Sequence, residues 1–273
     1  MKLAELVSTF EDLWPVSQAE PWDVVGLVSG NPNNHVSNVL LTVDLTHDVI
    51  EEAKTVGADL ILAHHPFLLK GVTNLSELTS KGSVIAELIR NNIALYSAHT
   101  NADSSKTGTS TVLAKAIGLA EHSVLAESNL GNGIGIIGTL AIDVTLGELA
   151  AKLNSVLPQT ASGVRVAGDF DRKVSKVALC AGAGDSYLQL ALDSGADLYI
   201  TSDLRHHPAL EILEQAKAKG REFALVDISH WAAEYLWLDQ AKQELGGLPI
   251  EISISDIRTD VFDFLMNLPK GEN

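Results

Sequence analysis

The chain has 273 residues, of which 46% are hydrophobic and 20% are charged, a composition typical of a globular protein long enough for roughly two domains. Its formal net charge of −16 argues against a bulk electrostatic grip on nucleic acid or on an anionic membrane. No stretch approaches the roughly 18 consecutive apolar residues of a membrane-spanning helix. The single cysteine, Cys180, excludes an internal disulfide and favours a reducing compartment, so a soluble cytoplasmic protein is expected.

The first half of the chain alternates between helical and extended patterns. Strands are predicted near residues 22–28, 38–44, 59–63 and 93–98. Helices are predicted over residues 3–13, between the N-cap Thr46 and the terminating Gly57, over 81–91 and over 110–118. Strands that alternate with helices in this way indicate α/β units with mostly parallel strand pairing.

The second half follows a glycine-rich turn at residues 129–133. A strand is predicted near 135–142, a helix near 146–157, and short strands around Val164 and Val177. The expected fold is therefore two related α/β units, residues 1–126 and 127–273, with mixed, mostly parallel sheets. The C-terminal segment is expected to pack on the first unit.

The two halves share an internal echo. Val39-Leu40-Leu41 and Gly57-Ala58-Asp59-Leu60 recur as Val177-Ala178-Leu179 and Gly195-Ala196-Asp197-Leu198, offset by 138 positions (177 minus 39, and 195 minus 57). The first copy continues to His64-His65-Pro66 and the second to His206-His207-Pro208. The echo favours two units of related topology over chance recurrence of common residues. The second pair is expected either to face a metal cavity or to begin a helix with Pro208 in its first position.

Two adjacent histidines, His64 and His65, end the apolar run at 59–63. Successive strand side chains point to opposite faces, so neighbours converge on one space only where a strand ends. Pro66 favours this arrangement, because it holds His65 in extended backbone torsions. A structural pair that caps a neighbouring element is the alternative.

Each half also carries an imidazole four residues before a carboxylate, in His99 with Asp103 and in His230 with Glu234. On a helix these positions share a face. Neutral nitrogen with carboxylate oxygen suits zinc, iron, manganese, cobalt or nickel. The alternative is a hydrogen-bonded network of histidine and acid inside the core.

Because His64 and His65 would strain to bind one ion together, each could take a separate ion, with Glu234 or Asp103 bridging the two. The residues therefore predict a two-metal site at the junction of the two units, with positions left for water.

These residues resemble the dinuclear metal-centre proteins of the Nif-three type, also known as GTP cyclohydrolase 1 type 2. The similarity covers nearly the whole chain and includes Trp22-Asp23, Asp44-Leu45-Thr46, His64-His65-Pro66, His99-Thr100-Asn101-Ala102-Asp103, Asp203-Leu204-Arg205-His206-His207 and Asp227-Ile228-Ser229-His230 with Glu234. The resemblance implies that two divalent ions are bound by His64, His65, Asp103, His230 and Glu234, with Glu234 shared. His99 is then a further ligand or a proton carrier.

The resemblance also implies two α/β domains assembled as a homohexamer, without the inserted domain of some members. The implied activity is hydrolysis of GTP or a related nucleotide, in which the imidazole ring of the purine opens and formate leaves. Two alternative functions are also considered. One is a non-enzymatic metal-handling or regulatory assembly, and the other is a metal-dependent phosphodiesterase or nucleotidase.

Three positions depart from the family pattern, because Val24, Ile136 and Val261 stand where asparagine, arginine and proline are usual. None of them is an implied ligand, so the departures affect substrate contacts more than metal binding. For Asp23 and Asp44, surface or capping roles are expected at least as much as substrate binding.

Overall fold

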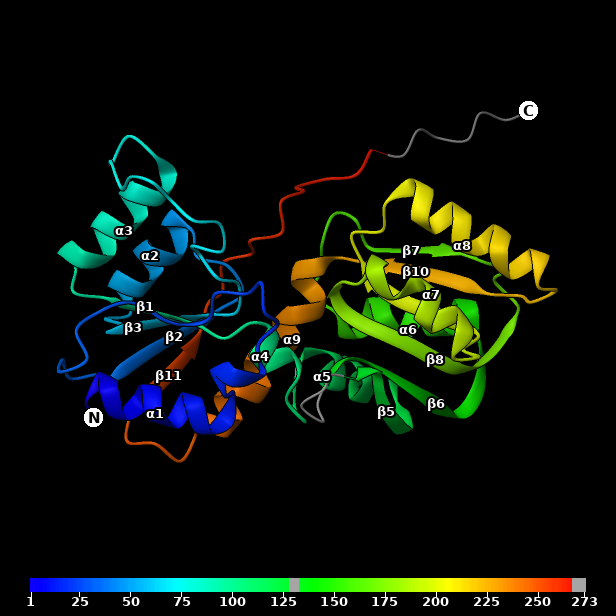
Figure 1. Cartoon of the computed structure of the whole chain (residues 1–273), viewed down its shortest axis with the longest axis horizontal. Coiled ribbons are helices and arrows are strands. Elements are labelled where there is room, and N and C mark those ends of the chain that lie inside the picture. The colour runs from blue at the N-terminus through cyan, green and yellow to red at the C-terminus, as the bar shows by residue number, and fades with distance from the viewer. Residues whose placement is uncertain (128–132, 267–273) are drawn as a thin grey trace. The chain divides into compact units, whose positions relative to one another are not determined.

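The computed structural model describes residues 1–127 and 133–266 (Figure 1). The glycine-rich turn predicted at 129–133 therefore lies, except for its last residue, outside the described residues. The chain forms two compact units. The first contains the described residues of 1–112, 126–135 and 234–259, and the second contains those of 113–125, 136–233 and 260–273.

The first unit is built on a five-stranded sheet. Its order is β1 (Gly26–Ser29), β4 (Ala94–Ser97), β3 (Leu60–Ala63), β2 (Asn38–Thr42) and β11 (Glu251–Ile254). Four strands run parallel, and β1 pairs antiparallel with β4. Its helices are α1 (Leu3–Leu13), α2 (His47–Thr55), α3 (Ser80–Arg90) and the short α4 (Thr100–Asp103), with a 3-10 turn at Val16–Gln18.

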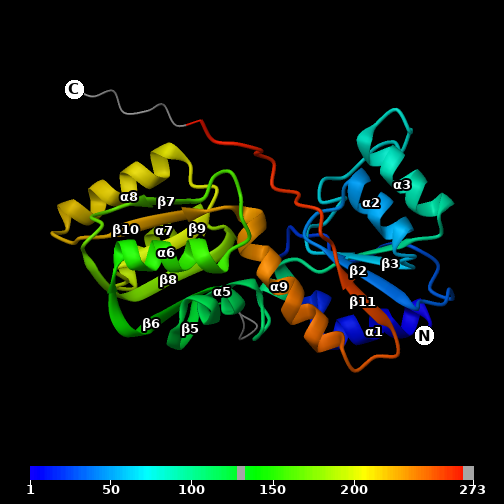
Figure 2. The same cartoon turned by 180° about the vertical axis from the view of Figure 1, so that it is seen from behind.

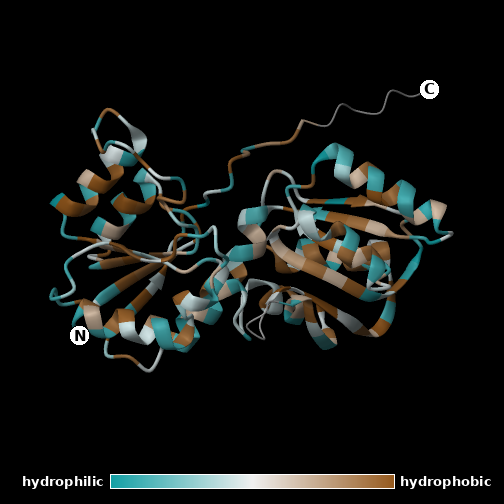
Figure 3. Cartoon of the chain, viewed as in Figure 1, coloured by the Kyte–Doolittle hydropathy of each residue, from teal (hydrophilic) through white to brown (hydrophobic). Residues whose placement is uncertain are grey.

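Helices cover both faces of this sheet, with α2 and α3 on one side and α1 on the other (Figures 1 and 2). All four residues of β3 and of β4 are buried, since neither face of these strands meets water. Strand β3 therefore reads as a continuous apolar run, whereas β4 ends in Tyr96 and Ser97. Brown, which marks hydrophobic residues, recurs along the strands in Figure 3. The Thr46 hydroxyl accepts a hydrogen bond from the Val49 amide at 3.3 Å, so the predicted N-cap of α2 is confirmed.

The second unit contains a six-stranded mixed sheet. Its order is β5 (Leu119–Glu127), β6 (Gly133–Thr145), β8 (Lys173–Ala183), β9 (Leu198–Ser202), β10 (Ala224–Ile228) and β7 (Val164–Ala167). Strands β8, β9 and β10 run parallel, whereas β6 and β7 pair antiparallel with their neighbours β8 and β10. Its helices are α6 (Leu146–Val156), α7 (Leu188–Asp193) and α8 (His206–Ala218), with a 3-10 turn at Asp185–Tyr187.

Two helices contain residues of both units. They are α5 (Thr109–Ile117) and α9 (His230–Leu245). None of the helices in the described ranges combines the length and the hydropathy that crossing a membrane requires.

The echo between the two halves is a repeat of structure. The order β1-β4-β3-β2 in the first sheet matches β7-β10-β9-β8 in the second, with the same strand directions. Val39 lies opposite Leu60 as Val177 lies opposite Leu198, so the register is the same in both units. The aspartates of the echo also make the same contacts. Asp59 accepts hydrogen bonds from the amides of Ser37 and Asn38 at 2.7 and 3.0 Å, and Asp197 accepts them from Ser175 and Lys176, both at 2.8 Å.

The repeat does not extend to the histidine pairs. With the offset of 138 positions that the register fixes, the counterparts of His64 and His65 are Ser202 and Asp203. His206 and His207 lie one turn further on, as the exposed first residues of α8. Helix α8 begins two residues earlier than expected, so that Pro208 is its third residue. This position tolerates proline because amides of the first turn have no partner inside the helix.

Candidate metal centre

Three histidines of the first unit follow the ends of neighbouring parallel strands. His64 and His65 come directly after β3, and His99 comes two residues after β4. The β2–β3 ladder continues past the strand end, because the amides of His64 and His65 donate to the carbonyls of Thr42 and Val43, both at 2.9 Å. The carboxyl ends of parallel strands meet at one edge of a sheet, which is where sites in such sheets are built.

His64 is fully buried, and its Nδ1 lies 2.8 Å from the carbonyl oxygen of Ala98. Because a carbonyl only accepts, Nδ1 carries the proton and Nε2 presents a lone pair. Among the described residues, Nε2 is buried with no hydrogen-bond partner. Its charged neighbours are Asp103 Oδ1 and Glu234 Oε1, each 3.6 Å away, beyond hydrogen-bond range.

These 3.6 Å separations suit atoms that share an ion. Bonds of about 2.0–2.1 Å in tetrahedral geometry place neighbouring ligand atoms about 3.3 Å apart. A buried polar atom without a partner is costly, and an ion would supply the missing partner. The His64 environment therefore fits a bound divalent cation.

His65 lies between two carboxylates. Its Nδ1 is 2.7 Å from Asp44 Oδ1, and its Nε2 is 2.9 Å from Glu234 Oε2. Asp44 is itself fixed, since its Oδ2 accepts a hydrogen bond from the Thr259 hydroxyl at 2.6 Å. The Glu234 carboxylate is thus divided, with Oε1 facing His64 and Oε2 facing His65. One carboxylate therefore contacts the environments of both imidazoles.

His99 is the N-cap residue of α4, and its ring lies 5.3 Å from that of His64 and 5.5 Å from that of His65, centroid to centroid. One potential ligand atom from each of the three histidines lies within 4.8 Å of the other two. Asp23 holds His99 Nδ1 at 3.0 Å, and the same Asp23 oxygen accepts from the Thr100 amide at 3.1 Å. The ring is therefore oriented by a carboxylate that is itself anchored.

The two acids of the predicted spacing lie on helices of this unit. Asp103 ends α4, one turn after His99, and its Oδ1 accepts a hydrogen bond from the Thr109 hydroxyl at 2.5 Å. Glu234 is the fifth residue of α9 and is buried at 3% exposure. The fully buried Trp237 follows on that helix, and its ring centroid is 5.3 Å from that of His64.

His230 is the first residue of α9, one turn before Glu234, and belongs to the second unit. Its Nδ1 lies 2.6 Å from Asp203 Oδ2, in the same unit. Four of the five implied ligands, together with His99, therefore lie in the first unit. The place of His230 among the ligands stays a prediction.

The local field favours positive charge. Burial opposes charging of His65, but the Glu234 charge and the hydrogen bonds to Asp44 and Glu234 outweigh it and raise the pKa of His65 well above its ordinary value. Burial likewise opposes charging of His64, and the carboxylates of Glu234 and Asp103 nevertheless raise its pKa. The carboxylates that raise these pKa values are also groups that would favour a divalent cation at this place.

The orienting carboxylates are the functional residues that sequence reasoning missed. Asp44, Asp23 and Asp203 each lie against Nδ1 of one histidine, at 2.7, 3.0 and 2.6 Å. A partner on Nδ1 fixes the tautomer and leaves Nε2 for a ligand role, which is the usual support of a metal-binding histidine. The available signal was the position of Asp44 two residues after β2, beside the strand that ends in His64.

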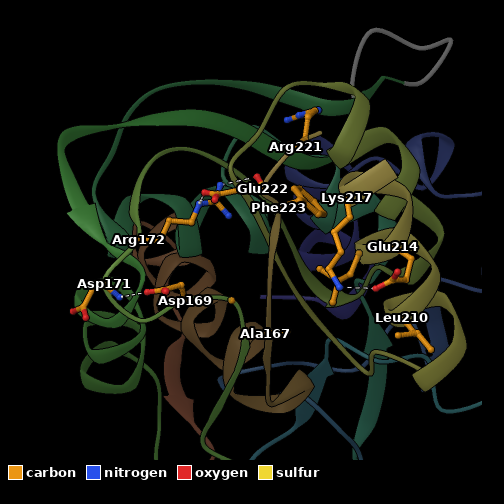
Figure 4. A pocket seen from close by; sticks show the side chains of 12 residues that line it. Ala167, Asp169, Asp171, Arg172, Leu210, Glu214, Lys217, Arg221, Glu222 and Phe223 are labelled. Carbon is orange, nitrogen blue, oxygen red and sulfur yellow. Dashed lines mark hydrogen bonds and ion pairs between the residues drawn. The ribbon is translucent and has the colours of Figure 1, made fainter. Parts of the chain in front are cut away.

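The second unit contains a cavity of about 690 Å³ that is less suited to chemistry (Figure 4). Its lining includes Ala167, Leu210 and Phe223, with basic side chains around them. These cations are engaged locally. Lys217 pairs with Glu214 at 2.6 Å, Arg172 donates to the carbonyl of Glu222 at 2.7 Å, and Arg221 donates to the carbonyl of Ala196 at 3.0 Å. The cavity is therefore lined partly by apolar side chains, and its basic side chains are occupied by local partners.

Comparisons of sequence place these residues among known proteins. A family model described as Duf34/NIF3 (NGG1p interacting factor 3) matches residues 1–261. A Streptomyces coelicolor protein named GTP cyclohydrolase 1 type 2 homolog is 39% identical over 269 residues, covering 95% of this chain and 93% of that protein. A Clostridium perfringens protein of the same name is 34% identical, covering 97% of this chain and 100% of that protein. The resemblance inferred from the motifs is thereby confirmed.

Solved structures agree with the fold. A Bacillus cereus protein related to NIF3 superposes with a TM-score of 0.86 at 25% identity, covering 97% of this chain and 99% of that chain. A Staphylococcus aureus hypothetical protein gives the same TM-score and coverage at 29% identity. The predicted α/β class with mixed, mostly parallel sheets is confirmed.

Proposed function

The chain belongs to the Duf34/NIF3 family, and from that premise we propose that it binds two divalent metal ions and hydrolyses GTP or a related nucleotide. The divided carboxylate of Glu234, with one oxygen toward each of His64 and His65, is the observation that carries the proposal. Relatives named GTP cyclohydrolase 1 type 2 homolog support the choice of substrate.

Each ion has its own imidazole in this proposal. His64 and Asp103 would hold one ion and His65 the other, and Glu234, whose carboxylate faces both histidines, would contribute to both. His230, one helical turn before Glu234, is the remaining proposed ligand. The set contains no thiolate, which suits a site that keeps positions open for water rather than a closed structural zinc site.

When bound, the ions would supply Lewis-acid chemistry to a hydrolysis. The protein's own proton carrier is His99, because Asp23 holds its Nδ1 and leaves Nε2 to exchange a proton. Asp23 keeps its charge in this role. Burial opposes ionisation of Asp23, but hydrogen bonds from His99 and Thr100 lower its pKa to about 2. At neutral pH the Asp23 carboxylate is therefore ionised and can hold His99 Nδ1.

The family resemblance extends the proposal to a homo-oligomer, with a hexamer as the expected state. Sedimentation of the purified protein tests this directly. A monomer at micromolar concentration would contradict it.

The activity is tested by incubating metal-loaded protein with GTP and measuring formate. Formate release in proportion to enzyme is the expected result. Phosphate release without formate would indicate a phosphodiesterase or nucleotidase instead. Absence of both products, together with rapid transfer of the ions to a chelator, would indicate a metal-handling protein.

A further inference from the structure

One tryptophan of the first unit is exposed beside the candidate metal centre. Trp22 is 58% exposed, whereas Trp14 and Trp237 are fully buried and Trp231 is 8% exposed. Leaving a large aromatic side chain in water forgoes burial free energy, so a fixed and exposed tryptophan points to a contact that the isolated chain does not make.

The backbone that carries Trp22 is held in place. Glu20 to Asp23 form a turn closed by a hydrogen bond from the Asp23 amide to the Glu20 carbonyl at 2.9 Å, with Pro21 in the position that proline favours. The Glu20 amide donates to the Thr100 hydroxyl at 2.9 Å, and Asp23 accepts from the Thr100 amide at 3.1 Å. The turn is thus tied on both sides to the start of α4.

Trp22 lies next to the proposed proton carrier. Its ring centroid is 5.9 Å from that of His99, and the two planes cross at 76°. His99 is in turn 5.3 Å from His64. The same loop leaves Val24 at 48% exposure, so the indole lies at an apolar rim one ring away from the metal ligands.

We propose that Trp22 is a substrate-binding residue that stacks on the planar heteroaromatic ring of the ligand, a nucleobase. The assignment rests on the proposed function for the class of ligand, but it requires binding only and not turnover. An aromatic surface attracts every base through its π-face, so Trp22 supplies affinity without distinguishing guanine from adenine. The neighbouring Val24 is apolar, so it adds no hydrogen-bonding side chain to this contact.

The test is equilibrium binding of GTP, ATP and inorganic tripolyphosphate to the metal-loaded full chain by titration calorimetry. Trp22→Leu is expected to weaken the binding of GTP and the binding of ATP by the same factor. That factor is roughly 5- to 100-fold, which corresponds to the loss of one base stacked on an aromatic ring. Tripolyphosphate, which has no base, should bind unchanged. Trp22→Phe should retain most of the affinity, because it keeps an aromatic face.

Ile89→Ala is the matched control. Ile89 is 65% exposed on α3 of the same unit, before β4 rather than after it, so it lies away from the strand ends that carry the histidines. Its GTP affinity should equal that of the wild type. Nucleotide binding should also quench the fluorescence of the wild type more than that of Trp22→Leu.

Four results would overturn the assignment: no nucleotide binding by the wild type, unchanged GTP affinity in Trp22→Leu, an equal loss for tripolyphosphate, or altered sedimentation of Trp22→Leu. The last would make Trp22 a contact between copies of the chain. GTP binding that depends on Trp22 without formate release would refute the proposed hydrolysis and leave the stacking role intact.

Discussion

The two histidine pairs of this protein share the sequence His-His-Pro but differ in burial and in the acids around them. The rings of His64 and His65 lie 5.2 Å apart, and those of His206 and His207 lie 5.3 Å apart. The first pair extends a buried strand and is surrounded by the acids Asp44, Asp103 and Glu234, whereas the second pair is exposed at the start of α8. Proximity of two imidazoles is therefore not the signal. Burial beside carboxylates, with Nδ1 already engaged, is what prepares a histidine for an ion.

Register sharpens the comparison. The positions in the second unit that correspond to His64 and His65 are Ser202 and Asp203, the latter with a left-handed φ of 57°. Where the first unit has the imidazole of His65, the second has the carboxylate of Asp203, which lies against His230 Nδ1. The repeated fold thus carries the proposed ligands His64 and His65 at one set of strand ends and, at the corresponding place in the second unit, an acid that contacts a histidine.

The largest effect is expected for Glu234→Ala, which removes the carboxylate shared between the two halves of the site. Metal content should fall from two ions per chain to nearly none, measured by elemental analysis after dialysis. Aspartate at this position is the matched variant, because it keeps the charge but shortens the reach. Two ions retained in Glu234→Ala would contradict the bridging role.

His65→Ala is expected to lose mainly one of the two ions, because His64 keeps its own lone pair and acid partners. The double variant His206→Ala/His207→Ala is the control from the second unit and should retain both ions. Metal titration of the two proteins side by side tests the comparison between the pairs directly. Equal loss of metal in the two variants would show that burial and orienting acids do not distinguish the two histidine pairs.

Asp44→Asn should weaken metal binding about 10- to 100-fold while leaving the ligands present, since it removes the charge that orients His65. Competition with a chelator of known affinity measures the change. Asp59→Asn is a control within the same sheet, because Asp59 makes its hydrogen bonds at the opposite strand ends. An unchanged affinity in Asp44→Asn would refute the orienting role.

The smallest effect concerns an acid of the second unit that serves the fold alone. Hydrogen bonds from the backbone and side chain of Thr145 lower the pKa of Glu148 in the capping box of α6. A carboxyl whose pKa is lowered by folding stabilises the protein above its unfolded pKa, and this contribution is lost as pH falls through the folded pKa.

Glu148→Gln should therefore unfold at slightly lower urea concentration than the wild type at pH 7. The difference should shrink as pH falls below the unfolded pKa of about 4.5 and vanish once pH is below the folded pKa. Metal ions should leave this difference unchanged. A gap between the two proteins that does not shrink as the pH is lowered from 7 would indicate packing rather than charge as its cause.

Local patterns were enough to predict much of the fold. The bounds of α1, α2 and α3 fall close to those expected, because apolar spacing and the Thr46 cap act within a few residues. Strand β11 was not predicted, since Glu251–Ile254 is half-exposed and gains its order only by pairing with β2. That partner lies more than 200 residues away in sequence, so no local signal marks the strand.

The candidate site was likewise predicted in part from local patterns. Residue type and spacing were enough to select His64, His65, His99, Asp103 and Glu234, which the first unit contains together. The roles of Asp23 and Asp44 depend on the order of β1 to β4 in the sheet, which spacing along the chain does not encode. The extension of the echo to His206 and His207 was wrong, because the tripeptides were compared without strand register, whereas the alternative prediction that this pair begins a helix is confirmed.

The pairing of β11 with β2 brings segments from late in the sequence to the candidate site. Thr259, five residues after β11 ends, holds the Asp44 carboxylate that orients His65, and Glu234 precedes the strand by less than twenty residues. Residues up to Thr259 must therefore be synthesised before these contacts can all form. Products truncated before residue 234 would contain His64, His65 and His99 without Glu234, so the proposed metal binding would depend on segments that are translated after most of the proposed ligands.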